Sequence, residues 1–284
     1  MGARMLDARP LYRSPPPVLR PFVQSVWASG QPGQEPSGPP TREHVLPTGQ
    51  MHLVIRLADD PLRLFATTAD TSGQLLSAAV VGGARASFYI REVSRPPSAI
   101  GAQLRPGASQ AQFGVPAGEL AGRHIALEDL WGRDVARIRE QLAALPSPAD
   151  RLHAFEGMLA ARLPLVRGIH PAVASALQQF VVSPDVRDEV KRSGFSHRTF
   201  IAMFRRAVGL SPKLYCRLIR FQRALALLSR SSESFCVEVA LAAGYSDQAH
   251  FNREFREFTG VTPTEYRRIS PTATHHLPIG RGSR

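Results

Sequence analysis

The chain has 284 residues, of which 43% are hydrophobic and 20% are charged, a composition that excludes an intrinsically disordered protein. No apolar run approaches the roughly 20 residues of a membrane span, so we expect no membrane contact. The net charge is +12, and residues 169–284 hold most of it, with 17 basic and 9 acidic side chains. This basic excess favours a polyanionic partner such as nucleic acid.

The cysteines and the N-terminus indicate the compartment. Cys216 and Cys236 match no metal-ligand or redox spacing, so we expect free thiols in a reducing environment. The first residues lack the apolar core of a signal peptide. These features predict a cytoplasmic protein that needs no cofactor or metal ion.

Residues 1–110 are predicted to form a β-rich sensory or regulatory domain. Apolar residues between 51 and 57 alternate with His52, Val54 and Arg56, which is typical of a half-buried strand. Residues 1–17 should be ordered only by contact with the domain, and residues 31–40, rich in Gly and Pro, should form a loop. The predicted strands are 22–27, 51–57, 62–66, 76–81, 87–90 and 100–104. Many short strands with turn signals favour a small cupin-like barrel or sandwich.

Residues 111–168 are predicted to form a helical linker segment. Its predicted helices, separated by Pro or Gly, are 115–121, 126–130, 134–145 and 149–163. We expect this segment to connect the β-rich domain to the C-terminal part. It could also carry a surface for self-association, which makes a homodimer one candidate assembly.

The first of two similar units begins with predicted helices at 170–180 and 184–192. Gly194 supplies the positive φ of a tight turn, and Ser196 is well placed to cap the following helix. Phe200 and Phe204 recur at helical spacing and should face the core. A long amphipathic helix at 212–228 follows and could hold two modules at a fixed separation.

The second unit repeats this plan about fifty residues later. A predicted helix at 235–243 leads to the turn Gly244–Asp247, where Ser246 or Asp247 caps the next helix. Phe251 and Phe255 should face the core. Both units close with the pattern Gly-x-x-Pro-x-x-Tyr. Such a repeat, together with the basic charge, predicts two helix-turn-helix units that bind DNA.

The predicted fold class is therefore α+β with a distinct all-α domain. A cupin-like barrel at 1–110 and the helical linker at 111–168 precede an all-α domain at 169–270. In that domain the long helix joins the two helix-turn-helix units. Residues 271–284 have little apolar content and are expected to be a flexible tail.

The C-terminal residues resemble the DNA-binding domain of the AraC/XylS family of bacterial transcription regulators. The resemblance covers about 170–268. It is most specific in the run Ala240–Gln248 and in Phe251, Phe255, Gly260, Val261, Thr262, Pro263, Tyr266 and Arg267. The N-terminal segments 20–27, 45–49 and 104–107 look like the barrel domain of actinobacterial-type members. The resemblance implies a one-component transcription regulator whose two recognition helices occupy adjacent major grooves of promoter DNA. RNA polymerase and a small-molecule effector are further implied partners.

Base-reading residues are implied by position in this family. Asn or Gln suits adenine and Arg suits guanine, so the second unit should carry more of the sequence specificity. The predicted base-reading residues are Arg198, Ile201, Ala202, Gln248, His250, Asn252 and Arg253. For phosphate contact and positioning we predict Ser196, His197, Arg205, Arg217, Arg220, Ser246, Asp247 and Arg256.

The first unit departs from the family pattern at one helix. Glu189, Val190 and Ser193 stand where the family has leucine-like residues and a small one. We therefore expect a less well packed scaffold helix and a weaker hold on DNA from the first unit.

Two other functional classes compete with a regulator. Glu43, His44 and His52 could be metal ligands of a cupin-type enzyme fused to DNA-binding helices, although they lack a compact His-x-His pair. A DNA-repair alkyl acceptor would need clustered cysteines, which the two separate thiols cannot supply. We therefore predict no catalytic residues.

Overall fold

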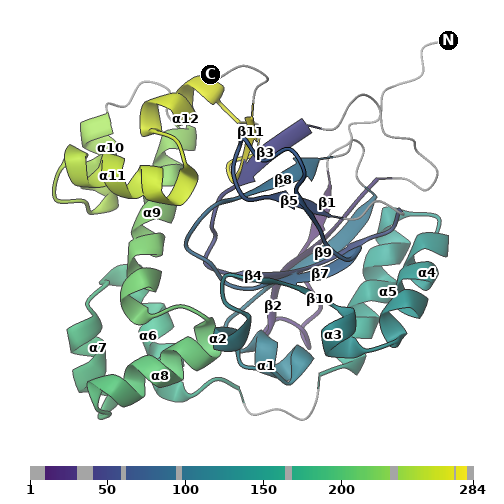
Figure 1. Ribbon diagram of the computed structural model, residues 1–284. Coiled ribbons are helices and arrows are strands. Elements are labelled where there is room, and N and C mark those ends of the chain that lie inside the picture. Colours follow the sequence, from purple (N-terminus) through teal and green to yellow (C-terminus); the bar gives the residue numbers. More distant parts are fainter. Residues whose placement is uncertain are drawn as a thin grey trace.

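The computed structural model describes residues 10–30, 41–58, 62–93, 98–163, 168–230, 236–271 and 273–279. Two facing antiparallel sheets form the N-terminal domain, and helices α6–α12 form a second body beside it (Figure 1). The predicted α+β class is therefore correct. The predicted loop at 31–40 lies outside the described residues, as do residues 1–9 and 280–284 of the predicted terminal segments.

The first sheet has six strands in the order β1-β2-β9-β4-β7-β10, and the second has five in the order β11-β3-β8-β5-β6. Among the described residues no strand pair joins the two sheets, so the predicted barrel is an open pair of sheets. The six-stranded sheet contains β1 (Leu11–Arg13), β2 (Val23–Ser29), β4 (Met51–Arg56), β7 (Ala79–Gly82), β9 (Ala99–Leu104) and β10 (His124–Ala126). The five-stranded sheet contains β3 (Thr41–Val45), β5 (Arg63–Phe65), β6 (Gln74–Leu75), β8 (Tyr89–Val93) and β11 (His276–Ile279).

The alternation predicted for β4 is present. Met51, Leu53 and Ile55 are buried in the apolar core, whereas His52 and its alternate neighbours are half-buried. The same core contains the buried residues of α4 (Asp134–Ala144) and α5 (Pro148–Ala161), and α5 contacts β2. The apolar face of the six-stranded sheet is thus covered by the linker helices, and the polar face is turned to the other sheet.

The linker segment is not wholly helical. It contains α1 (Ala108–Phe113), α2 (Ala117–Leu120) and α3 (Glu128–Trp131) in addition to α4 and α5. The helix predicted at 126–130 is wrong at its start, because residues 124–126 form β10 and pair with β7. Only the four residues of α3 are helical there. Edge pairing with a central strand outweighs the local apolar spacing.

The C-terminal domain has the predicted arrangement of two units joined by a long helix. Its helices are α6 (Pro171–Val182), α7 (Val186–Ser193), α8 (His197–Val208), α9 (Pro212–Arg230), α10 (Cys236–Ala243), α11 (Gln248–Thr259) and α12 (Pro263–Ile269). Figure 1 shows α8 and α11 towards opposite ends of α9.

The two units differ in how their cores connect to the rest of the molecule. Phe180, Phe200 and Phe204 form a small separate core in the first unit, with Phe180 and Phe204 ring centroids 5.8 Å apart. In the second unit Phe221 and Phe255 belong to the core that also fills the N-terminal domain. The second unit is therefore packed into the main body of the protein.

The expected flexible tail is wrong for residues 276–279, which form β11. This strand pairs antiparallel with β3 in the register His276 to Val45 and Ile279 to Arg42. Leu277 is buried, and the Tyr266 hydroxyl donates to the Thr274 carbonyl at 2.9 Å. Few apolar residues suffice here because the strand gains a backbone ladder along the edge of an existing sheet.

Candidate nucleic-acid interface

The turn and cap of the first unit form as the sequence predicts. Gly194 closes α7 with φ of 71°. The Ser196 hydroxyl caps α8 by accepting from the Thr199 backbone N–H at 3.2 Å. The start of α8 is thus fixed by side-chain capping, and its remaining first amides point outward.

The outer face of α8 presents the predicted residues. His197, Arg198, Ala202 and Arg205 are exposed, and Ile201 is half-buried. Phe200 and Phe204 are fully buried on the opposite face. Arg198 and Arg205 are therefore the charged side chains that α8 offers to a ligand from the predicted set.

The second unit is capped by Asp247. Its carboxylate accepts from the His250 backbone N–H at 2.7 Å, and the Ser246 hydroxyl donates to it at 3.0 Å. These bonds lower the pKa of Asp247, the backbone bond from His250 most of all. Asp247 and Ser246 therefore set the start of α11, and their predicted contact with phosphate stays a prediction.

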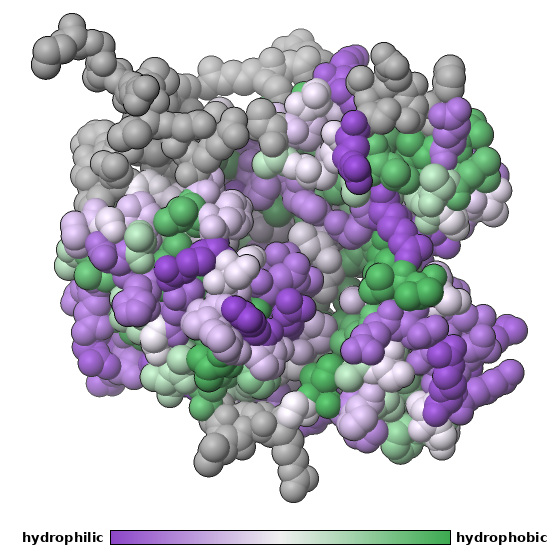
Figure 2. Space-filling model, turned by 180° about the vertical axis from the view of Figure 1, so that it is seen from behind, coloured by the Kyte–Doolittle hydropathy of each residue, from purple (hydrophilic) through white to green (hydrophobic). Residues whose placement is uncertain are grey.

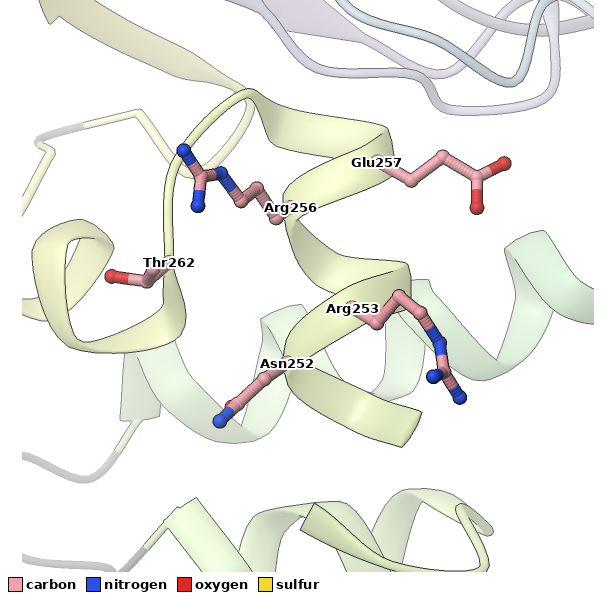
Figure 3. A pocket seen from close by; sticks show the side chains of 5 residues that line it. All are labelled: Asn252, Arg253, Arg256, Glu257 and Thr262. Atoms are coloured by element: carbon pink, nitrogen blue, oxygen red, sulfur yellow. The ribbon is translucent and has the colours of Figure 1, made fainter. Parts of the chain in front are cut away.

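The outer face of α11 carries polar residues around a shallow depression. Gln248, Asn252, Arg253 and Arg256 are exposed. Figure 3 shows Asn252 and Arg256 on the side of α11 that faces Thr262, while Arg253 and Glu257 point the other way. Thr262 caps α12 through a reciprocal pair of bonds with Glu265. Thr262 is not among the residues predicted for the interface, although its capping-box spacing is readable from the sequence.

His250 does not share this outer face. Its ring lies edge-on to Tyr245 at 5.3 Å, and Nε2 lies 3.9 Å from a carboxylate oxygen of Glu254. The Ser246 hydroxyl is 3.2 Å from Nδ1. This half-buried ring supports the turn, and its predicted base reading stays a prediction.

Arg217 and Arg220, predicted to contact phosphate, have protein partners. Both guanidinium groups bind Glu254, Arg217 at 2.7 Å and Arg220 at 3.1 Å. Arg217 also binds Glu257 at 2.6 Å. The Glu254 side chain keeps only 3% of its surface exposed. We call Glu254, Arg217 and Arg220 the Glu254 node. It connects α11 to α9. It was not predicted from the sequence because Glu254 lies on a different helix from both arginines.

The scaffold helix of the first unit carries a buried charge where the resemblance predicts apolar residues. Glu189 is 2% exposed, and its carboxylate lies 3.1 Å from Arg192 Nη1. Ser193 donates to the Val190 carbonyl at 2.7 Å, and Val190 packs against the core of the first unit. The helix is thus packed, with an ion pair in place of a leucine-like contact.

Hydrophobicity differs between the two units on the rear face of the molecule. Figure 2 shows hydrophilic residues gathered over the first unit, at the lower right, and hydrophobic ones over the second, at the upper right. Val237 and Leu241 of α10 are 46% and 59% exposed. The polar outer face of α11 is thus distinct from an apolar face on α10.

The first recognition helix rests on the linker. α2 packs against α8, and a Cβ at Gly118 would come within 3.0 Å of the Arg205 carbonyl oxygen. The Gly107 N–H donates to the Ala207 carbonyl at 3.0 Å. The C-terminal end of α8 is therefore fixed to the N-terminal half of the chain.

The second recognition helix is fixed to the five-stranded sheet. His44 Nδ1 lies 2.9 Å from the Thr259 carbonyl oxygen at the end of α11. The next residue, Gly260, has φ of +79°, and a Cβ there would lie 2.7 Å from Phe88. Gln222 of α9 also donates to the Pro47 carbonyl at 2.5 Å. Both recognition helices thus end on the N-terminal half.

The alternative metal ligands do not come together. Glu43 and His44 are neighbours on β3 and point to opposite faces, Glu43 to Arg91 and His44 to Thr259. His52 instead lies beside His124, with ring centroids 5.9 Å apart. Within the described ranges no group of three or more His, Cys, Asp or Glu is arranged to hold a metal ion.

Two family models match the chain. A helix-turn-helix domain covers residues 190–269, and a domain of unknown function (DUF6597) covers residues 12–126. The first match begins in α7 and ends with α12. The C-terminal module is therefore a helix-turn-helix domain.

Several curated regulators are similar to part of this chain. The F1 operon positive regulatory protein of Yersinia pestis is 39% identical over 77 residues, 27% of this chain and 25% of its own. The transcriptional regulator ArgR of Pseudomonas aeruginosa is 29% identical over 138 residues, 45% of this chain and 42% of its own. The melibiose operon regulatory protein of Escherichia coli is 27% identical over 106 residues, 37% and 34% of the two chains. The chain thus matches less than half the length of these relatives.

Solved structures give more distant similarities. The C-terminal domain of AraT from Geobacillus stearothermophilus is 26% identical, covers 36% of this chain and 88% of its own, and has a TM-score of 0.33. ToxT from Vibrio cholerae is 10% identical, covers 84% and 100%, and has a TM-score of 0.44. In the part of the chain that the structure describes, no helix is long and apolar enough to cross a membrane.

Proposed function

We propose that this chain, whose C-terminal domain belongs to the AraC/XylS family, is a transcription regulator that binds promoter DNA in sequence-specific fashion. The observation that carries the proposal is the pair of capped, polar-faced helices α8 and α11 held towards opposite ends of α9. The 19 residues of α9 correspond to a length of about 28 Å at 1.5 Å per residue. This is comparable with the roughly 34 Å between successive major grooves on one face of DNA.

The exposed residues divide the work between the units. In α11, Gln248 and Asn252 suit adenine and Arg253 suits guanine. In α8, Arg198 is the residue suited to a base edge, and Ile201 and Ala202 can contact a thymine methyl group. Arg205 and Arg256 are exposed beside these residues and suit phosphate, as do His197 and the amides at the cap of Ser196.

Selection of bound sequences from random duplex DNA with the full chain tests this function. We expect a site with two preferred segments about 10–10.5 base pairs apart, one for each recognition helix. Arg253→Ala should relax the preference at one position of one segment, at a cost of about 1–3 kcal/mol. Arg198→Ala should relax the preference at one position of the other segment.

Arg137 on α4 provides the matched control, since it is exposed and lies outside the helix-turn-helix units. Arg137→Ala should leave both segments unchanged. If selection returns no preferred sequence, or if Arg253→Ala and Arg137→Ala give the same site, the proposal is wrong.

Further partners belong to the proposal on the ground of the family alone. A promoter-bound regulator would contact RNA polymerase, could act as a homodimer and could respond to a small-molecule effector. Its place of action would be the cytoplasm, where the DNA is. Size-exclusion chromatography with light scattering on the full chain would measure the oligomeric state.

A catalytic function has less support. The separation of Glu43, His44 and His52 removes the proposed ligand set of a cupin-type enzyme. Burial raises the pKa of the Cys216 thiol to about 12, so it carries little of the thiolate that an alkyl acceptor needs. Regulation by DNA binding is the function that the described residues favour.

A further inference from the structure

The space between the two sheets holds charged and aromatic residues that DNA binding does not use. We define the inter-sheet cluster as His52, Arg85, Tyr89, Arg91 and His124. His52 on β4 and His124 on β10 both pair with Gly82 on β7, so their side chains lie in one row. The Tyr89 ring from the opposite sheet lies 4.7 Å from the His124 ring. The cluster therefore bridges the sheets.

Two glycines shape one wall of this site. A Cβ at Gly82 would lie 2.2 Å from the His52 ring, and one at Gly101 would lie 2.6 Å from the Trp27 ring. Both rings therefore lie against bare backbone of the six-stranded sheet. All five residues of the inter-sheet cluster, and Trp27, are half-buried and keep accessible surface.

The two arginines of the cluster differ in how their charge is balanced. Arg91 pairs with Glu43 at 2.7 Å. Arg85 donates to the Gly122 carbonyl at 3.2 Å and lies over the Tyr89 ring at 4.5 Å. Among the described residues no carboxylate pairs with Arg85. Because a guanidinium keeps its proton in proteins, this positive charge is left without a counter-charge.

Two hydrogen-bond donors of the cluster also lack acceptors. Arg85 Nη2 lies 3.1 Å from His124 Nδ1, and since arginine can only donate, Nδ1 accepts and the proton of the neutral ring is on Nε2. Both His124 Nε2 and Arg85 Nε are buried and meet no acceptor among the described residues. Buried donors of this kind normally have partners.

Burial and the nearby arginines also lower the pKa values of the two histidine rings. Burial first, and then the charge of Arg85, lower the pKa of His124 to about 2 and that of His52 to about 3. Both rings are therefore neutral near pH 7 and offer one N–H each. The cluster presents donors and positive charge, which attract an anion and repel a metal cation.

We propose that the inter-sheet cluster binds the carboxylate or phosphate group of a small organic anion, with Arg85 as its counter-charge and Arg85 Nε and His124 Nε2 as donors. A neutral carbonyl would satisfy the donors but would leave the charge of Arg85 unbalanced.

The position of Arg85 connects this site to a recognition helix. A Cβ at Gly209, which ends α8, would lie 3.0 Å from the Ala84 Cβ, one residue before Arg85. Gly83 lies against the Leu120 carbonyl of α2, the helix on which α8 rests. On the basis of the proposed DNA-binding function, a bound anion should therefore change how α8 is held and alter DNA affinity.

Thermal unfolding of the full chain tests the anion site without knowledge of the natural ligand. Inorganic phosphate, acetate and benzoate are titrated against chloride at equal ionic strength, with benzamide as the neutral analogue of benzoate. We expect a saturable rise of about 3 °C at ten times Kd for at least one of the three anions, and none for benzamide. If no anion exceeds chloride, the proposal is overturned.

Variants separate a binding role of Arg85 from a structural one. Arg85→Gln should abolish the rise, whereas Arg123→Gln, at a nearby exposed arginine, should keep it. Without anion, Arg85→Gln should unfold at an equal or higher temperature, because it removes an uncompensated charge. A lower unfolding temperature with the anion response retained would assign Arg85 to the scaffold and overturn the site.

DNA binding by the same proteins distinguishes this inference from the proposed function. Arg85→Gln should bind the selected DNA without anion as the unmodified chain does, and should lose the effect of the anion. If the unmodified chain binds no DNA but shows the Arg85-dependent rise, the anion site stands and the proposed function fails.

Discussion

The Glu254 node should hold the second recognition helix in place, and Glu254→Gln isolates its charge. The substitution keeps the shape of the side chain and leaves Arg217 and Arg220 facing a neutral amide. Removing one partner of a fully buried pair costs about 3–5 kcal/mol. Since the arginine side chains keep 28% and 23% of their surface exposed, water compensates in part, and we expect about 2–3 kcal/mol.

Calorimetric unfolding measures this loss. For a chain of this size each kcal/mol shifts Tm by about 2–4 °C, so Glu254→Gln should lower Tm by about 4–12 °C. Glu257→Gln is the control, because Glu257 binds the same Arg217 but is 54% exposed. An exposed pair contributes about 0–1 kcal/mol. Equal drops in Tm for the two variants would refute the reasoning, because the burial of Glu254 would then add nothing to the stability.

Four further outcomes are expected. Because the folded-state pKa of His52 is about 3, below its unfolded value near 6.5, His52 alone should lower the stability by about 1.4 kcal/mol per pH unit as the pH drops through this window, in addition to His124 and His275, whose pKa values are also lowered. Denaturant unfolding of the unmodified chain and of His52→Gln at pH 7 and pH 5 measures this as a smaller slope in the variant. Asp247→Ala should cost about 1 kcal/mol of unfolding free energy through loss of the α11 cap, and an unchanged denaturation midpoint would contradict this. Gly260→Ala should lower Tm more than Gly194→Ala, which has a similar φ but nothing within 4 Å of the added Cβ; equal shifts would mean that contact with Phe88 is unimportant. Arg220→Gln should leave the slope of log K against log salt unchanged for DNA binding, whereas a phosphate contact would reduce it by about 0.9.

The parts of the fold that depend on local signals were predictable. Phe200 and Phe204 are buried as their spacing predicts, because a helix places residues four apart on one face. The caps Ser196 and Asp247 act within three residues of their own position. The residue pattern of β4 was readable because every second side chain faces the same core.

The parts that depend on distant partners were not predictable. β11 gains its structure from β3, more than two hundred residues earlier, and its own composition resembles a tail. Arg217 looks like a phosphate ligand on its own helix, and only the fold brings Glu254 to it. In each case tertiary contacts decide between roles that the sequence leaves equal.

The pairing of β11 with β3 means that the DNA-binding domain is attached to the sheets at both of its ends. The chain enters it before α6, and after α12 it returns to the N-terminal domain as an edge strand. A domain on one tether can swing freely, but one on two tethers can only rotate about the line that joins its attachment points. A fragment that ends at residue 270 would also leave β3 as an uncovered sheet edge, which invites pairing between molecules. Excising either half of this protein therefore changes the half that remains.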